Sequence, residues 1–188
     1  NPTLIGYITG FMNFQKPMCY QPVQQDNLAL VEVVHKRANT LQTMIAPQDP
    51  LDIVRAAEEA SSKFNIDIAL IFAVIEIESR YSKKAKSKKG CKGLTQTSKS
   101  TGKYMAEKLE LKNYNPFDIR HNILTGIGYL KELIDQFGDL KTAITVYNRG
   151  IVNWLDNPVH SRYSHGVVKR YNYLRKLIKK EDGLACNK

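Results

Sequence analysis

The sequence lacks any long hydrophobic run. Its longest uninterrupted apolar stretch is Ile68–Ile75, far shorter than the ~20 residues that a transmembrane helix needs. We therefore expect no membrane span. The sequence also lacks strand-length segments with alternating polar and apolar residues, and it contains no Asn-Gly pair. β-Hairpins and β-sandwiches are therefore not expected.

Cysteine is scarce. The chain has Cys19, Cys91 and Cys186 with no C-x-x-C pair, and its four histidines are not spaced with acids as metal ligands are. We expect no metal site, and the absence of a phosphate-binding glycine loop favours no cofactor. Cys91 stands between glycines, where a small buried residue is expected. A disulfide between Cys19 and Cys186 is left open.

Acidic residues are few relative to basic ones. Lys and Arg number 28, Asp and Glu 18, and the formal net charge is +10. Such an excess favours an anionic partner: nucleic acid, an acidic membrane surface or a bacterial cell-wall polymer. No Asp or Glu occurs between Ser79 and Ala106, a stretch that carries many basic residues: Arg80, Lys83, Lys84, Lys86, Lys88, Lys89, Lys92, Lys99 and Lys103.

The spacing of apolar residues predicts an all-α fold. Residues 1–25 show no period and are expected to form an irregular arm, and residues 26–188 the folded domain. Asp26 is expected to cap the first helix, Asp67 the third and Asp118 the fifth. Helices are predicted over 28–41, 49–64, 68–81, 98–111, 119–137, 140–147 and 161–180, with loops over 83–97 (including a short β-like excursion) and 151–160. Because helix 68–81 is apolar on nearly every face, we expect it to be the buried central helix.

Two glutamates end this central helix. At ~100° per residue, Glu78 continues the face of Ile71, Val74 and Ile75. A partly desolvated carboxylate has a raised pKa and suits general acid catalysis, although a helix-end Glu paired with a basic residue is the alternative. Glu76 lies ~200° away around the helix, and we expect it to form an ordinary ion pair with Arg80.

A series of short blocks follows Glu78 in a fixed order. Together they resemble the catalytic domain of soluble lytic transglycosylases, in the goose-type lysozyme-like group, over about residues 64–175. That family carries ES, A-x-S, G-A-x-G-L-M-Q, N-P-F-D and A-Y-N-x-G blocks and a Tyr before the last helix. The blocks here are Glu78-Ser79, Ala85-x-Ser87, Gly90–Gln96, Asn115-Pro116-Phe117-Asp118 with Asn122-Ile123, Gly128-Tyr129-Leu130, Val146-Tyr147-Asn148-Arg149-Gly150, and Tyr163 with Val167-Val168.

The resemblance implies a lysozyme-like helical fold and a site. Glu78 matches the single catalytic acid/base, and Tyr163 matches the Tyr whose hydroxyl lies near it. Polar or supporting residues of the substrate cleft are matched by Ser87, Gln96, Tyr147 and Asn148. For Tyr147 and Tyr129, core packing is the alternative.

The sequence departs from the family pattern at several positions. Thr95 replaces the usual Met and Cys91 the usual Ala. Ser98 and Lys99 replace a Met-Pro pair whose Met walls a sugar subsite, and Val146 replaces Ala. These departures predict a pocket of different shape and a different choice of glycan.

The stretch after Glu78 lacks a second carboxylate, which a glycoside hydrolase needs. The resemblance therefore implies a peptidoglycan lytic transglycosylase that cleaves the bond between N-acetylmuramic acid and N-acetylglucosamine and forms a 1,6-anhydro ring. The alternatives are a muramidase that uses Asp118 or Asp139, and a non-catalytic wall-binding module. We expect a monomer that binds glycan strands and the anionic wall, not nucleic acid, in the periplasm or outside the cell, with a phage lysin or virion protein as a further origin.

Overall fold

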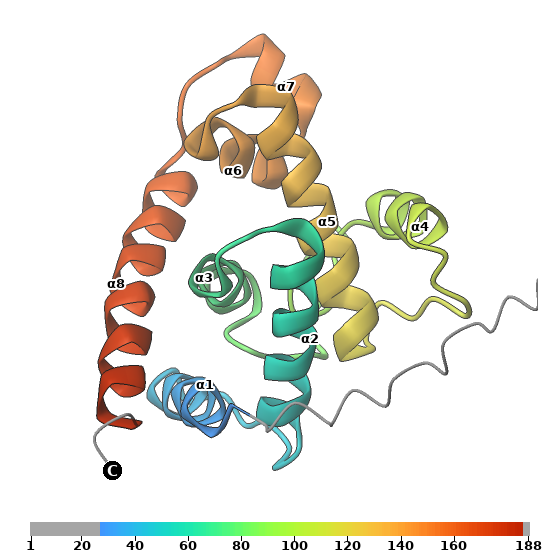
Figure 1. Ribbon diagram of the computed structural model, residues 1–188. Coiled ribbons are helices and arrows are strands. Elements are labelled where there is room, and N and C mark those ends of the chain that lie inside the picture. The colour runs from blue at the N-terminus through green and yellow to red at the C-terminus, as the bar shows by residue number, and fades with distance from the viewer. Residues whose placement is uncertain (1–26, 186–188) are drawn as a thin grey trace, which may run out of the picture.

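The computed structural model describes residues 27–185, with side chains as far as residue 180. This part of the chain contains helices and no strand; two isolated β-bridges, Lys86↔Lys92 and Lys92↔Thr97, lie in the loop after α3. The all-α expectation is therefore confirmed (Figure 1). The helices are α1 (Leu28–Thr40), α2 (Asp49–Phe64), α3 (Ile68–Ser79), α4 (Lys99–Lys108), α5 (Ile119–Phe137), α6 (Leu140–Arg149), α7 (Ile151–Asp156) and α8 (Arg162–Ala185).

The helix ends follow mainly from capping. Asp67 and Asp118 cap α3 and α5 as predicted, their side chains accepting from the N–H groups of Ala69 and His121. The cap of α1 is Asn27, one residue later than predicted. The arm over residues 1–25 and the Cys19–Cys186 disulfide lie outside the described residues.

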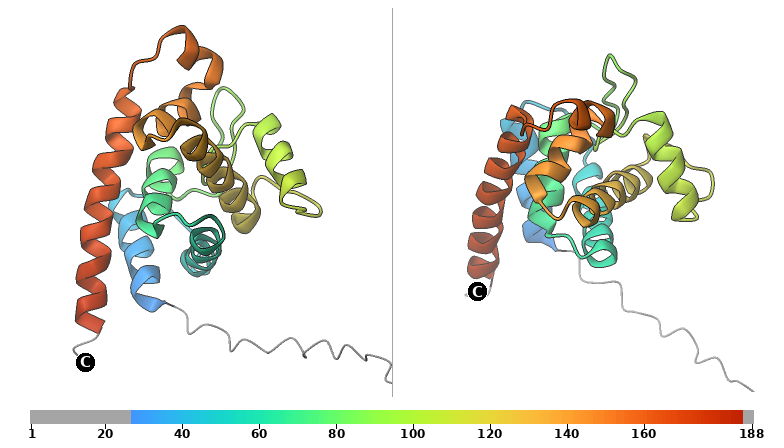
Figure 2. Two further views of the ribbon diagram at one scale, coloured as in Figure 1. Left: turned by 45° about the horizontal axis from the view of Figure 1, so that its top comes forward. Right: turned by 90° about the horizontal axis from the view of Figure 1, so that it is seen from above.

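The apolar helix α3 is buried along most of its length, as predicted. Helices α2 and α8 contact it, α2 also pairs with α5, and α8 packs on α1 and α6 (Figures 1 and 2). Buried side chains of α1, α2, α3, α5, α6 and α8 form one continuous core. The helix ends at Ser79 and is capped by Arg80, whose left-handed φ of 53° changes the direction of the chain.

A buried ion cluster around Glu76 connects α3 to α1 and α8. Glu76 is only 3% exposed, and both its carboxylate oxygens bind Arg37 of α1, at 2.7 and 3.0 Å. Arg170 of α8 approaches the same carboxylate, with Nε 3.0 Å from Oε1. The predicted pairing of Glu76 with Arg80 is therefore wrong, because Arg80 has already left the helix and does not keep the i,i+4 geometry.

Helix α7 is the element that the sequence analysis missed, since 151–160 was predicted as a loop. The guanidinium of Arg149 donates to the carbonyls of Asn153, Asn157 and Val159 at 2.7, 3.1 and 3.2 Å, and these contacts hold the segment folded back on α6. No residue of α7 is buried. No helix within residues 27–185 combines the length and apolar character required to cross a bilayer.

Two helical glycines give a test of the packing. A Cβ on Gly126 of α5 would lie 2.2 Å from Thr95 Oγ1, whereas a Cβ on Gly166 of α8 meets nothing within 4 Å. We predict that Gly126→Ala lowers the free energy of unfolding by about 1–3 kcal/mol through overpacking. The control Gly166→Ala should raise it by about 0.5–1 kcal/mol, because alanine loses less backbone entropy in a helix. Urea unfolding of both variants measures this, and a Gly126→Ala variant as stable as the wild type would contradict the packing.

Candidate active site

Glu78 lies in the last turn of α3 with its side chain partly buried. Burial raises the pKa of its carboxyl from an ordinary value of 4.5 to about 7, and a hydrogen bond from Tyr163 opposes part of this rise. No other carboxylate contributes to this shift of the Glu78 pKa. A carboxyl with this pKa is present in both protonation states near neutral pH, so it can donate a proton and then take one back.

Tyr163 comes from the first turn of α8, 85 residues away in sequence. Its hydroxyl donates a hydrogen bond to Oε1 of Glu78. Burial, together with the charge of Glu78, raises the pKa of Tyr163 well above its usual value. The phenol therefore stays protonated and remains a donor.

Tyr147 of α6 is the third residue of the site, after Glu78 and Tyr163. Its hydroxyl donates to the carbonyl oxygen of Thr95 at 2.8 Å, and its ring lies 5.9 Å from that of Tyr129. Burial raises its pKa strongly, and the charge of Glu78 adds to this rise, so the two groups are neighbours. Tyr147 therefore connects the Glu78 region to the loop that precedes α4.

Asn122 of α5 holds this loop in place. Its Oδ1 accepts from the backbone N–H of Thr95 at 2.8 Å. Its Nδ2 donates to the carbonyl of Lys92 at 3.0 Å and to Thr97 Oγ1 at 3.3 Å. Gly93 is required here, because a Cβ would lie 2.4 Å from both Asn122 Nδ2 and the carbonyl oxygen of Pro116. Asn122 belongs to one of the motif blocks of the sequence, but no role was predicted for it.

Gln96 and Ser87 take part in the folding of the same loop. Gln96 has a left-handed φ of 51°, and its Nε2 donates to the carbonyls of Ala85 and Gly93 at 3.1 and 2.9 Å. Ser87 is exposed, and its Oγ accepts from the N–H of Cys91 at 3.1 Å. Cys91 is partly exposed, so the expectation that it is buried is wrong. The substrate contacts expected of Ser87 and Gln96 stay predictions.

Asn148 follows Tyr147 near the end of α6, and its side chain is exposed. It therefore lies next to the Tyr147 contact without being part of the core. Its role toward a substrate stays a prediction.

Two departures from the family pattern have structural explanations. Thr95 is fully buried, and its Oγ1 bonds to the backbone carbonyl and the side-chain Oδ1 of Asn122 at 3.0 and 2.9 Å. Its side chain points toward α5, where Gly126 leaves room for it. Ser98 caps α4 by accepting from the N–H of Thr101 at 3.1 Å. Thr95 therefore lies between the loop and α5 and is not exposed on the surface of the loop.

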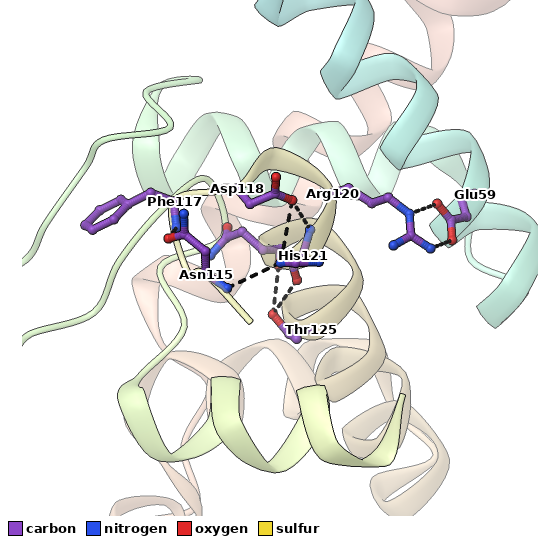
Figure 3. Close-up of polar contacts among 8 residues, drawn as sticks. Glu59, Asn115, Phe117, Asp118, Arg120, His121 and Thr125 are labelled. Carbon is purple, nitrogen blue, oxygen red and sulfur yellow. Dashed lines mark hydrogen bonds and ion pairs between the residues drawn. The ribbon is translucent and has the colours of Figure 1, made fainter. Parts of the chain in front are cut away.

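The segment before α5 is a turn built from its own side chains (Figure 3). Asn115 Oδ1 accepts from the N–H of Phe117 at 3.0 Å, and Asp118 caps α5 through the N–H of His121 at 2.8 Å. Arg120 binds Glu59 of α2 in a two-pronged ion pair, with both distances 2.6 Å. These contacts fix the start of α5 and thereby the position of Asn122.

The family model described as the transglycosylase SLT domain matches residues 55–164. The chain belongs to the transglycosylase SLT family. The matched range covers α3 to α6, the loop held by Asn122, and Tyr163.

Other SLT-type proteins resemble the chain. It is 32% identical over 117 residues to a transglycosylase of Enterobacteria phage PRD1, covering 61% of this chain and 41% of that protein. The chain thus spans less than half the length of this relative. Two solved lytic transglycosylases share the fold: an inactive mutant of Slt from Pseudomonas aeruginosa (TM-score 0.50, 17% identity, 81% of this chain and 28% of that one) and a 70-kDa soluble enzyme in complex with bulgecin A (TM-score 0.51, 22% identity, 82% and 27%).

Replacing Glu78 tests its burial through the pH dependence of stability. The raised pKa means that the folded SLT domain binds this proton more tightly than the unfolded chain, so ionisation of Glu78 destabilises the fold as pH rises from about 4.5 to about 7. Glu78→Gln cannot ionise. We predict that it matches the wild type near pH 4 and is more stable by about 1–3 kcal/mol above pH ~8, as measured by urea unfolding. A stability difference that does not change with pH would contradict the burial of Glu78.

The Tyr163 hydrogen bond makes a second prediction. It lowers the pKa of Glu78, so Tyr163→Phe should raise that pKa further above about 7. Tyr171, on the same helix, bonds instead to Asp67 at the other end of α3, 2.9 Å away. The control Tyr171→Phe should therefore leave the pKa of Glu78 unchanged. NMR titration of the glutamate side-chain carboxyl carbons measures both variants, and equal shifts in the two would contradict the assigned contact.

Proposed function

We propose that this SLT domain is a peptidoglycan lytic transglycosylase and that Glu78 is its acid/base. The observation that carries the proposal is the carboxyl of Glu78, which has a pKa of about 7 and a phenol donor against one oxygen. A group that both gives and receives a proton in one cycle works best with a pKa close to the working pH.

The reaction needs two proton transfers by the same group. Protonated Glu78 gives its proton to the glycosidic oxygen between N-acetylmuramic acid and N-acetylglucosamine, and the bond from that oxygen to the muramoyl C1 breaks. The acetamido oxygen of the substrate stabilises the positive charge at C1. The muramoyl C6 hydroxyl then forms a bond to C1, and its proton returns to Glu78. The products are a free N-acetylglucosamine end and a 1,6-anhydro ring, and no water is consumed.

The tyrosines fit this cycle. The hydroxyl of Tyr163 holds Oε1 of Glu78, which leaves the other oxygen of the carboxyl for the substrate. Its hydrogen bond also stabilises the ionised form that exists after the first proton transfer. Tyr147 contributes by fixing the Thr95 carbonyl and thereby the loop that carries Gln96. Ser87, Gln96 and Asn148 are proposed to contact the sugars.

A hydrolase would need a second carboxylate to activate water. The two candidates from the sequence are both used as helix caps: Asp118 accepts from His121 N–H, and Asp139 accepts from Thr142 N–H at 2.7 Å. Neither contributes to the raised pKa of Glu78. This arrangement favours attack by the C6 hydroxyl of the substrate over attack by water.

The proposed partner is the glycan strand of the bacterial cell wall. Lys84, Lys86, Lys88 and Lys89 are exposed on the loop after α3, where they would attract anionic wall polymers. Lys83 is less available, because it binds Asp49 at 2.6 Å. Action at the wall from the periplasm, from outside the cell or as part of a virion is proposed, and the phage relative supports the last of these.

Replacement of Glu78 tests the assignment. Glu78→Gln should abolish the release of soluble fragments from purified peptidoglycan, because an amide cannot carry the proton. The matched control Glu132→Gln changes a glutamate that pairs with Lys108 at 2.5 Å on the surface, and it should keep wild-type activity. Near wild-type release by the Glu78→Gln variant would show that Glu78 is not the acid/base.

A further inference from the structure

The buried cluster around Glu76 has no part in the reaction described above. It joins three helices: Glu76 of α3, Arg37 of α1 and Arg170 of α8. The ring of Tyr173 lies near both guanidinium groups, 5.4 Å from Arg37 and 5.3 Å from Arg170. The hydroxyl of Tyr81 also reaches Glu76, at 3.5 Å.

The position of Arg170 on α8 relates this cluster to the active site. Arg170 follows Tyr163 by two turns, so both side chains leave the same face of α8 at points ~10 Å apart. Their partners on α3, Glu76 and Glu78, point to opposite sides of that helix. Figure 1 shows α8 passing beside α3, and the contacts of Tyr163 with Glu78 and of Arg170 with Glu76 both lie between these two helices.

Apolar packing alone does not specify this arrangement closely. Contacts between Val167, Leu174 and the α3 side chains are non-directional, and they tolerate small shifts of α8 along its axis. The ion pair between Arg170 and Glu76, with Nε 3.0 Å from Oε1, weakens when its partners separate, and the Glu76 carboxylate is too buried for water to replace the lost contact. The contact between Arg170 and Glu76 therefore restricts the axial position of α8 near Tyr163.

We propose that Arg170 is a positioning residue for the active site: by binding Glu76 it holds α8 at the axial position that places the Tyr163 hydroxyl on Glu78. A shift of about 1 Å at a catalytic group is enough to cost up to about a hundredfold in rate. The inference rests on the proposed function only for its activity readout, since the contact of Tyr163 with Glu78 is measured independently below.

The central variant is Arg170→Met, which keeps the length of the side chain and removes its charge. Glu76 stays paired in this variant, because Arg37 binds both of its oxygens. We expect about a tenfold loss of kcat with little change of KM. Tyr163→Phe should lose about ten- to a hundredfold. If Arg170 acts through Tyr163, the double variant should be no slower than Tyr163→Phe alone within about a factor of two.

Arg170→Lys keeps the positive charge and loses the planar fork of the guanidinium. We expect it to recover part of the activity and to serve as the test protein if Arg170→Met does not fold. The matched control is Arg175→Met on the same helix, which loses a more exposed ion pair with Asp67 at 3.5 Å and should keep wild-type kcat.

Titration of Glu78 separates this inference from the proposed function. The titratable groups facing Glu78 are Tyr163 of α8 and Tyr147 of α6. By NMR between about pH 5 and about pH 9, Arg170→Met should raise the Glu78 midpoint in the same direction as Tyr163→Phe, and Arg175→Met should not. This readout stands even if the wild-type protein cleaves no glycan, an outcome that would refute the proposed function alone.

Three results would overturn the positioning role. The first is an unchanged Glu78 midpoint in Arg170→Met. The second is an equal loss of rate from Arg170→Met in the wild-type and Tyr163→Phe backgrounds, which would show that Arg170 does not act through Tyr163. The third is a wild-type Glu78 midpoint in Arg170→Lys without any recovery of kcat, because the position of Tyr163 on Glu78 would then not account for the loss of rate.

Discussion

The hydrogen bond between Tyr163 and Glu78 is the contact on which the rest of this site depends. It joins the start of α8 to the end of α3 across 85 residues of sequence. Burial alone would hold Glu78 in its neutral form over a wider pH range, and the phenol limits this effect by stabilising the anion. The same carboxyl can therefore give up a proton and recover it, which a surface glutamate or a fully enclosed one does less well.

Much of the described fold serves to keep this contact in place. Helix α3 is central and apolar, so Glu78 is carried by the most buried element of the bundle. On one side, Tyr147 and Asn122 hold the loop over 92–97 against α5 and α6. On the other, the carboxylate of Glu76 binds α1 and α8 together. The position of Glu78 is thus defined by hydrogen bonds and ion pairs that are buried or partly buried, in addition to apolar packing.

Local sequence signals predicted the helices well where caps mark their ends. Helix α5 has the predicted bounds because Asp118 caps its start and Gly138, with a φ of 66°, ends it. Helix α7 was missed because it is short, has no buried residue and depends on Arg149, whose contacts lie outside the helical pattern. Glu78 could be singled out because the apolar face of α3 leads to it.

Contacts between residues far apart in the chain could not be predicted from the sequence pattern. Glu76 suggested an i,i+4 pair, yet its partners Arg37 and Arg170 come from two distant helices. The resemblance to a known family indicated Tyr163, which helical periodicity alone could not have linked to Glu78. It indicated Gln96 as a sugar contact, but nothing in the sequence showed that its amide nitrogen bonds within the loop.

The central claim is that one carboxyl and the C6 hydroxyl of the substrate carry out the cleavage without water. The most direct measurement is mass spectrometry of the fragments released from purified peptidoglycan in ¹⁸O-labelled water. We predict fragments that end in 1,6-anhydro-N-acetylmuramic acid and carry no ¹⁸O at that end. Fragments with reducing N-acetylmuramic acid ends that contain ¹⁸O would contradict it and would identify a hydrolase.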